Sequence, residues 1–282
     1  MRAQVHLLGW DDRRMSEAAA GVGSTEDIIY QPPSGSDLAP MPHRFVLAEG
    51  GDMAKAWARW ENTLVWRKEQ NVDSILSKPH PRFALIKSKY KHCFHLSDHG
   101  GRVTYYERPG LSNFADMKKA GISKQDLLDH YVFCMEYLWQ VLQPKQTQRI
   151  TIIIDLAGVK VMDLVGESVT FLKTTVSVMS RHYPQRSFKI MVLNAPSFFN
   201  TLFAAVKPLL NEATKKKIDL LPVANAGVEM LKAIPAESLP VHYGGTSEIP
   251  LMKSPAEEAM LAHVQRVLEE NGQTMEQVPE ER

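Results

Sequence analysis

The run Ile150-Thr151-Ile152-Ile153-Ile154-Asp155-Leu156 is the part of the sequence that decides the fold. It is continuous, apolar and β-branched, as expected of a strand buried on both faces of a sheet. Residues 189–193 and 217–221 have the same character, and helical patterns over 166–182 and 198–210 separate the three runs. Strands that alternate with single helices imply parallel crossovers. The sequence therefore predicts an α/β fold with a mostly parallel sheet.

Before this run, two short strands are expected at 94–96 and 103–107, joined by the turn Asp98-His99-Gly100-Gly101. Ser123 with Asp126 forms a capping box that begins a helix. Asp52 caps an earlier helix that runs to about residue 70. After the three runs, helices are expected at 226–233 and from Ser254 to Gly272.

These patterns divide the chain into four parts. Residues 1–43 are rich in glycine and proline and are predicted to be a flexible leader. Residues 44–92 form a small helical region, 93–250 the main domain, and 251–282 a C-terminal helix with its tail.

Composition limits the function classes. In 282 residues, 33 basic and 32 acidic side chains nearly cancel, so overall charge does not favour a nucleic-acid partner. The two cysteines, Cys93 and Cys134, belong to no paired motif, which favours a reducing compartment. The sequence contains no long uncharged apolar stretch and no secretory signal pattern. We therefore expect a cytoplasmic protein.

Catalytic signatures are weak. Neither a dinucleotide-binding glycine motif nor a phosphate-binding loop is present. Gly166-Glu167-Ser168-Val169-Thr170 starts like a nucleophile elbow, but Thr170 replaces the second glycine that the turn needs. We therefore expect that the protein is not an enzyme and that it binds no cofactor.

Three histidines near the first turn are the best candidates for metal ligands in the sequence. His92, His95 and His99 lie close in sequence beside Asp98. Strand alternation places His92 and His95 on opposite faces, whereas zinc needs convergent ligands. The sequence therefore predicts no metal site among them.

The segment 198–210 is apolar nearly all round. Phe198, Phe199, Leu202, Phe203 and Val206 cover more than one helical face. Such a helix must be buried, or must face an apolar ligand or a membrane. A plain core helix remains an equal interpretation of this segment alone.

From about residue 44 to 249 the chain resembles the CRAL-TRIO family, the lipid-binding domain of fungal phosphatidylinositol/phosphatidylcholine transfer proteins. Four blocks in the expected order carry this resemblance. They are Asp98-His99-Gly100-Gly101-Arg102-Val103-Thr104-Tyr105; Val161-Met162-Asp163-Leu164-Val165-Gly166; Tyr183-Pro184-Gln185-Arg186 with Asn194-Ala195-Pro196 and Lys207-Pro208-Leu209; and Ile234-Pro235-Ala236-Glu237-Ser238-Leu239-Pro240 with Tyr243-Gly244-Gly245.

The resemblance implies a sheet floor and helical walls that enclose an apolar lipid cavity, with segment 198–210 as a mobile gate. It implies one phospholipid as cargo rather than as a cofactor, and no bond made or broken. The pocket and gate residues that it implies are Tyr105, Met162, Phe199, Phe203, Val206 and Ile218.

The resemblance also bears on the lipid headgroup. In members that bind phosphatidylinositol, an arginine, a glutamate, a threonine and a lysine hold the headgroup. Thr214 and Lys217 match two of these residues, Gln185 replaces the glutamate, and Glu49 stands where the arginine is expected. Gly158 and Lys160 replace the serine and threonine that contact phosphocholine. Phosphatidylinositol is the expected cargo, provided that Glu49 points to solvent or is neutralised by a cation such as Arg44.

A basic run precedes the first strand. Between Ser74 and Ser97 the chain has five basic residues and no acidic residue: Lys78, Arg82, Lys87, Lys89 and Lys91. Such a run favours an anionic membrane surface, although an ordinary solvated face has the same composition. We expect a monomer that contacts membranes peripherally and transiently.

Two alternatives remain open. The chain carries another hydrophobic ligand, such as a sterol, a tocopherol or a retinoid-like molecule, or it is an interaction module that uses the fold without carrying lipid.

Overall fold

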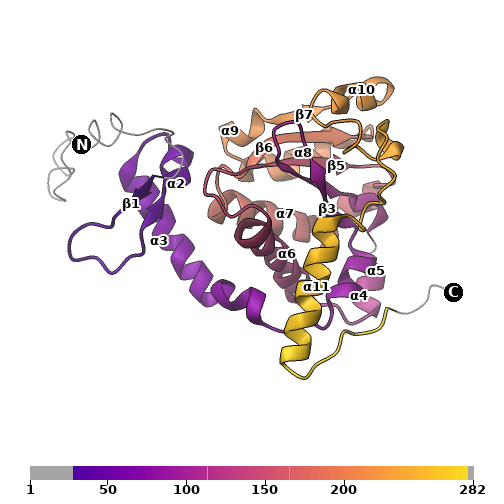
Figure 1. The fold of residues 1–282 in the computed structure, drawn as a ribbon. Helices are drawn as coiled ribbons and strands as arrows, with labels where there is room; N and C mark the ends of the chain where they lie inside the picture. The colour runs from indigo at the N-terminus through magenta and orange to yellow at the C-terminus, as the bar shows by residue number, and fades with distance from the viewer. Residues whose placement is uncertain (1–27, 113, 165, 279–282) are drawn as a thin grey trace.

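A computed structural model describes residues 28–278 apart from 113 and 165 (Figure 1). Its centre is a five-stranded sheet in the order β3-β4-β5-β6-β7. Only the β3–β4 pair is antiparallel, and β4 to β7 run parallel. The strands are β3 (His92–Ser97), β4 (Val103–Glu107), β5 (Ile150–Asp155), β6 (Ser187–Leu193) and β7 (Ile218–Leu220). The predicted mostly parallel α/β sheet is confirmed, with strand ends shifted by at most two residues.

The central strand β5 has two different environments. Ile153 is fully buried and packs with Cys93 and Met191 on one face of the sheet. Ile152 and Ile154 point to the other face, where they line a cavity. The apolar run thus serves a packed layer and a binding surface at once, because successive side chains alternate across a strand.

Helices cover both faces of the sheet. On the cavity face lie α6 (Lys124–Tyr137), α7 (Gly166–His182), α8 (Phe199–Val206) and α11 (Pro255–Glu270). The short α10 (Ala226–Leu231) packs on the opposite face through Met230. The predicted capping box of Ser123 and Asp126 starts α6, and a π-helical turn (Leu138–Leu142) extends it. Further short helices are α9 (Glu212–Lys215) and the 3-10 turns Pro109–Leu111, Val161–Leu164, Val223–Asn225 and Val241–Tyr243.

The segment predicted to be one helix over 198–210 is shorter than expected. The helix α8 ends at Val206, and the 3-10 turn Lys207–Leu209 follows it. Pro208 has no N–H to continue the ladder of hydrogen bonds, so the last predicted turn cannot be regular helix.

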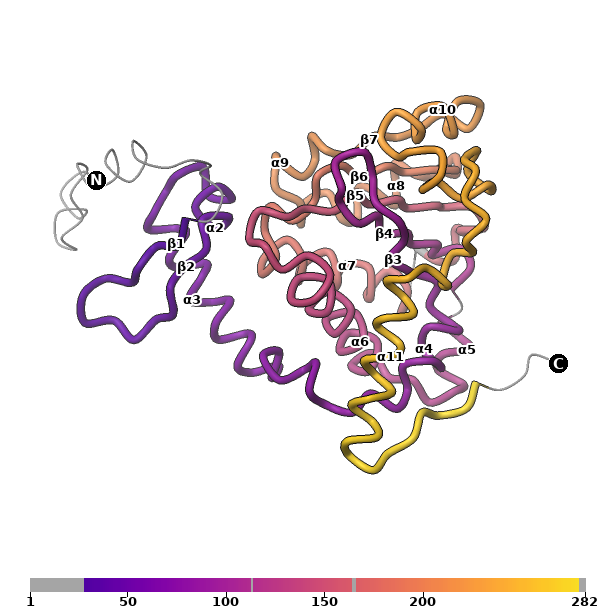
Figure 2. The backbone as a smooth tube through the Cα atoms, in the orientation of Figure 1, coloured from indigo at the N-terminus to yellow at the C-terminus, as the bar shows by residue number. Residues whose placement is uncertain are grey.

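The N-terminal region lies to one side of the sheet, and its long helix leads toward the lower ends of α6 and α11 (Figure 2). It consists of α2 (His43–Ala48) and α3 (Met53–Glu69), followed by the 3-10 turn Val72–Ser77 and α4 (Phe83–Lys89), whereas α5 (Phe114–Lys119) comes after β4 in the main domain. Asp52 caps α3 as predicted, because its side chain accepts a hydrogen bond from the Lys55 N–H at 3.1 Å.

Part of the predicted flexible leader has regular structure. Residues 1–27 lie outside the described residues. The remainder contains β1 (Ile29–Tyr30) and β2 (Met41–Pro42), which pair antiparallel. Met41 is fully buried against Phe45 and Trp60. The prediction is wrong for this part because one buried methionine and two short strands anchor a stretch that its glycines and prolines made look irregular.

The C-terminal helix and the tail pack on the helical region. Ser254 caps α11, which ends two residues before Gly272. The Glu276 N–H then bonds the Pro81 carbonyl at 2.9 Å. No helix within the described ranges 28–112, 114–164 and 166–278 is both long and apolar enough to cross a membrane.

Candidate binding cavity

A cavity of about 280 Å³ lies between the sheet and the helices α6, α7 and α8. This volume is far larger than a packing defect, because protein interiors leave few voids larger than one water molecule. The floor is formed by β4, β5, β6 and β7, and the walls by the three helices. Its apolar lining includes Tyr105, Trp139, Ile152, Ile154, Phe171, Leu172, Val176, Met179, Ile190, Val192, Phe199, Leu202, Phe203, Val206, Leu210 and Ile218.

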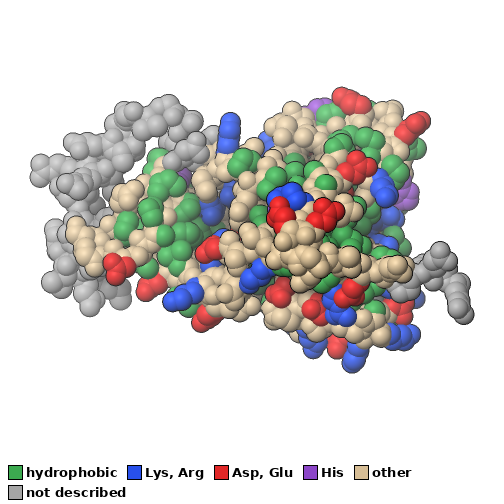
Figure 3. Space-filling model, turned by 60° about the horizontal axis from the view of Figure 1, so that its bottom comes forward, with side chains coloured by type: hydrophobic (Ala, Val, Ile, Leu, Met, Phe, Trp, Pro, Cys, Tyr) green, Lys and Arg blue, Asp and Glu red, His purple; other side chains and the backbone are tan. Residues whose placement is uncertain are grey.

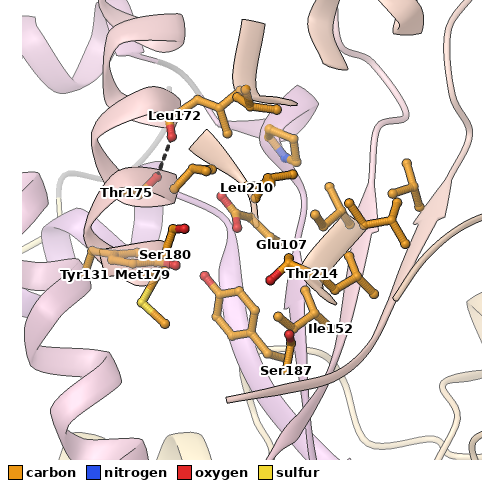
Figure 4. Close-up of a pocket in the computed structure, with 18 of the residues that line it drawn as sticks. Glu107, Tyr131, Ile152, Leu172, Thr175, Met179, Ser180, Ser187, Leu210 and Thr214 are labelled. Atoms are coloured by element: carbon orange, nitrogen blue, oxygen red, sulfur yellow. Dashed lines mark hydrogen bonds between the residues drawn. The ribbon is translucent and has the colours of Figure 1, made fainter. Parts of the chain in front are cut away.

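The close-up shows how the two sides face each other. Thr175, Met179 and Ser180 come from α7, and Ile152, Ser187 and Thr214 lie opposite them (Figure 4). The Thr175 hydroxyl donates to the Leu172 carbonyl at 3.1 Å, so the helix itself satisfies this polar group. The surface offered to a ligand is therefore mainly aliphatic and aromatic.

Five of the six predicted apolar pocket residues line this cavity: Tyr105, Phe199, Phe203, Val206 and Ile218. The sixth does not. Met162 lies in the 3-10 turn Val161–Leu164, and its side chain is 73% exposed. Its placement in the pocket is wrong, because the turn before α7 directs this side chain to solvent.

The α8 wall is only one helix thick. The rings of Phe199 and Phe203 stack with centroids 5.8 Å apart. Both rings line the cavity and stay half-buried, whereas Val206 is buried. The α8 helix therefore presents an apolar face inward without becoming part of a closed core.

One carboxyl group lies within the apolar lining. Glu107 ends β4, and the Tyr90 hydroxyl donates to its Oε1 at 2.6 Å. Burial raises the pKa of Glu107 above its usual value, since the charged form loses hydration. In Figure 4 this carboxyl group lies between the α7 side chains and Thr214. Glu107 was not among the predicted pocket residues. It follows Tyr105 by two residues on β4, so both side chains lie on the same face of the strand.

The three predicted headgroup residues lie close together at another part of the cavity. Gln185 and Thr214 line it, and the Lys217 ammonium donates to Gln185 Oε1 at 3.3 Å and to the Ser187 carbonyl at 2.8 Å. Gln185 has a φ of 60°, which is uncommon for a residue other than glycine.

No carboxylate of the described residues forms an ion pair with Lys217. Burial, and then the charge of Arg149, lower the pKa of Lys217. The lysine is therefore a partly buried cation whose ammonium donates to two neutral oxygens, an arrangement that suits an added anion.

Glu49 is neutralised, but not by Arg44. Arg59 Nη1 lies 2.6 Å from Glu49 Oε1, and the same guanidinium donates from Nε to the Arg181 carbonyl at 2.9 Å. Arg44 instead bonds the side chain of Gln146. Glu49 thus helps to join the N-terminal region to the end of α7, and its charge is compensated there.

The predicted basic run does not form one basic surface. Lys87 is buried, with its ammonium 2.7 Å from Glu257 Oε2, and Arg82 Nη1 lies 3.0 Å from Asp126 Oδ2. Basic and acidic side chains are interspersed on the lower part of the face in Figure 3. The expectation is wrong for Lys87 and Arg82, because α4 and its flanks turn these side chains toward acidic partners far away in sequence.

The three histidines near the first turn do not converge. His92 faces α6, His95 packs with Tyr106 on the other face of β3, and His99 is exposed with Nε2 3.1 Å from the Leu231 carbonyl. The sequence that begins like a nucleophile elbow also lacks its strand, since the 3-10 turn Val161–Leu164 precedes α7.

Comparisons with known proteins agree with this architecture. Residues 87–245 match the model of the CRAL/TRIO domain. The SEC14 cytosolic factor of Eremothecium gossypii is 30% identical over 214 residues, which cover 73% of this chain and 68% of that protein. The same-named protein of Candida glabrata is 31% identical, with 73% and 70% covered.

A more distant relative is named for its lipid activity. Phosphatidylinositol/phosphatidylcholine transfer protein SFH11 of Arabidopsis thaliana is 27% identical over 210 residues, which cover 72% of this chain and 55% of that protein. The crystal structure of Sfh5 has a TM-score of 0.60 at 17% identity and covers 75% of this chain and 73% of its own, so it shows the shared fold alone.

Proposed function

We infer that this chain, which belongs to the CRAL/TRIO domain family, is a lipid transfer protein that holds one phospholipid in its apolar cavity and exchanges it at membranes. Phosphatidylinositol is the cargo that we propose. The observation that carries this proposal is the apolar cavity between β5 and α8, lined by Ile152, Phe199 and Phe203.

The energetic argument concerns the acyl chains. Burying one methylene is worth about 0.8 kcal/mol, so two long acyl chains resist entering water by roughly 20 kcal/mol or more. An apolar cavity that replaces the bilayer interior removes most of this barrier. No residue needs to form or break a bond, and the role that we propose is that of a carrier rather than an enzyme.

The headgroup assignment rests on Lys217, Gln185 and Thr214. An ammonium bound only to neutral oxygens can give a charge-assisted hydrogen bond to a phosphate. The amide of Gln185 and the hydroxyl of Thr214 can pair with inositol hydroxyls. The names of the relatives support the phospholipid class.

Native mass spectrometry and a vesicle assay test the proposal. We expect the purified protein to retain one ligand of phospholipid mass per chain and to move labelled phosphatidylinositol between vesicles. A folded, monodisperse protein that holds no lipid and transfers none would contradict the carrier role and favour an interaction module.

Glu107 favours a second candidate cargo. Its carboxyl group and the Tyr90 hydroxyl form a small polar site inside an otherwise apolar cavity. Such a site, within a lining that is mainly apolar, suits a mostly hydrocarbon ligand with one hydroxyl group, such as a sterol, a tocopherol or a retinoid-like molecule. Lipid analysis of an organic extract distinguishes this cargo from a phospholipid.

A further inference from the structure

Three potential metal ligands meet in the core behind the cavity wall. His92 projects from β3, and His130 and Cys134 project from the same side of α6, four residues apart. His92 is 1% exposed, and His130 and Cys134 are fully buried. His92 Nε2 lies 3.0 Å from His130 Nε2, which lies 3.7 Å from Cys134 Sγ. The three ligand atoms are all within 4.8 Å of one another.

We propose that His92, His130 and Cys134 bind a zinc ion. Tetrahedral zinc, with its usual bond lengths to imidazole nitrogen and thiolate sulfur, separates two nitrogens by about 3.3 Å and a nitrogen from a sulfur by about 3.5 Å. The observed separations of 3.0 Å and 3.7 Å are close to both values. The third pair of ligand atoms, His92 Nε2 and Cys134 Sγ, lies within 4.8 Å, and a fourth ligand would be needed to complete the tetrahedron.

A hydrogen bond from a third histidine orients one of the ligands. The Nε2 atom of His80 lies 3.0 Å from His130 Nδ1, the ring nitrogen that faces away from the site. A hydrogen bond at this nitrogen fixes the ring and leaves Nε2 free to bind a metal, as in many zinc proteins.

Two other features bear on the charge of the site. Cys134 must lose its thiol proton to solvent when the ion binds, as thiol ligands of zinc do. The nearest cation is Lys87, whose ammonium donates to the His92 carbonyl at 2.7 Å. Glu257 lies 2.7 Å from that ammonium and compensates its charge. Lys87 therefore does not oppose the ion with a full unpaired charge.

A purely structural histidine chain is the competing interpretation. His80, His130 and His92 can form two successive hydrogen bonds from ring to ring, and such a chain needs no metal. It gives no role to Cys134, whose sulfur meets His130 at 3.7 Å. The metal interpretation uses the cysteine and predicts a signal that the histidine chain cannot produce.

The position of the site suggests its consequence. The His92 ring lies 4.5 Å from the Tyr90 ring and 5.9 Å from the Tyr105 ring, measured between centroids. A zinc ion here would clamp β3 to α6 next to these two tyrosines, which both line the cavity. It would stabilise this part of the lining whatever ligand the cavity holds, so the proposal is independent of the lipid assignment.

Cobalt titration tests the site. The full-length protein, purified without a polyhistidine tag and treated with a chelator, is titrated with Co²⁺ and read by absorbance. We expect one Co²⁺ per chain, with a thiolate-to-metal charge-transfer band and the visible bands of tetrahedral cobalt. Zn²⁺ should displace them. A folded wild-type protein that shows no such bands would overturn the proposal without any variant.

Two cysteine variants locate the ligand. Cys134→Ser should abolish the charge-transfer band and weaken Co²⁺ binding by more than about 100-fold, because it removes a direct ligand. Cys93→Ser is the matched control, since Cys93 is equally buried but packs with Met191 on the opposite face of the sheet. An unchanged band in folded Cys134→Ser, or its loss in folded Cys93→Ser, would exclude Cys134 as the thiolate ligand.

His80→Ala is a third variant, for which we expect a smaller loss of Co²⁺ affinity than for Cys134→Ser. It removes only the orienting hydrogen bond to His130, and we expect a loss of Co²⁺ affinity of about 10-fold to 100-fold with the charge-transfer band kept. If Cys134→Ser fails to fold, the wild-type spectrum together with this variant still decides the matter. No change of affinity in His80→Ala would contradict the assignment of His130 as a ligand through Nε2.

Discussion

The helix α6 and the segment that follows β6 line the same cavity but are built differently. Most of α6 is buried, its first turn has a capping box, and Glu136 anchors it through Arg67 at 2.9 Å. Residues 199–217, which we name the outer segment and which are all described, contain one buried side chain, Val206. Apolar residues that the fold does not bury can change position without opening the core. From this contrast we propose that α6 is the fixed wall and that the outer segment is the part that moves.

The largest effect is expected from the anchor of the fixed wall. Glu136→Ala removes the buried carboxylate that receives Arg67 and the Tyr183 hydroxyl, and leaves the half-buried Arg67 with only the exposed carboxylate of Asp73. We expect the free energy of unfolding to fall by about 3–5 kcal/mol, measured by urea denaturation. Glu270→Ala is the control, because its pair with Arg266 is exposed and worth about 0–1 kcal/mol. Equal losses in both variants would remove the distinction between the two walls.

The next effect concerns transfer rather than stability. Phe203→Asp places a charge where α8 faces the cavity, at a cost of several kcal/mol when the apolar ligand is bound. We expect lipid transfer between vesicles to fall by about 100-fold. The folded protein should stay nearly as stable as wild type, since Phe203 is only half-buried.

Ala204→Asp is the matched control for that change. Ala204 is the next residue of α8, is exposed and does not line the cavity. It should retain transfer. If a folded Phe203→Asp variant transfers lipid as well as Ala204→Asp does, the outer segment is not the gate.

Local patterns predicted much of this arrangement. The strand runs, the capping residues Asp52 and Ser123, and the limits of α7 all follow from neighbouring residues, and the structure agrees with them. The CRAL-TRIO resemblance predicted that Gln185, Thr214 and Lys217 belong to one site, and they lie close together in the structure. Their role in binding the headgroup stays a prediction.

The remaining features depend on contacts that no local pattern encodes. Lys87 meets Glu257 across 170 positions, and His92 meets His130 across 38. Met162 was misplaced because a turn, unlike a strand, has no period that fixes the direction of its side chains. Glu107 was accessible to reasoning, since alternation along β4 places it beside Tyr105, but a charged residue was not expected in an apolar lining.

A smaller effect is expected at the end of the outer segment. Lys217→Ala should weaken phosphatidylinositol transfer by about 1.5–3 kcal/mol in apparent affinity, the usual worth of a hydrogen bond to a charged group. Lys216→Ala is the control, because Lys216 is exposed and adjacent. Transfer of lipids without this headgroup should change little in either variant. Equal loss for every lipid in Lys217→Ala would mean that the lysine supports the fold and not the headgroup.

The smallest effect is a dependence on pH that only the outer segment should show. Burial and the charge of Arg149 hold the pKa of Lys217 below its usual value, so the empty carrier loses this positive charge at a lower pH than an ordinary lysine would. A bound phosphate favours the ammonium and raises the pKa again. Phosphatidylinositol affinity should therefore be full below the pKa of the empty carrier and fall as pH rises through it.

This pH dependence is measured by equilibrium binding from pH 7 to pH 10 with a short-chain phosphatidylinositol. The wild type and Lys216→Ala should lose affinity toward alkaline pH, whereas Lys217→Ala should have a lower affinity that does not depend on pH in this range. The fixed wall provides an internal check, because the stability difference caused by Glu136→Ala should not follow the same curve. If the alkaline loss persists in Lys217→Ala, another group titrates, and the phosphate does not bind where the outer segment meets Gln185.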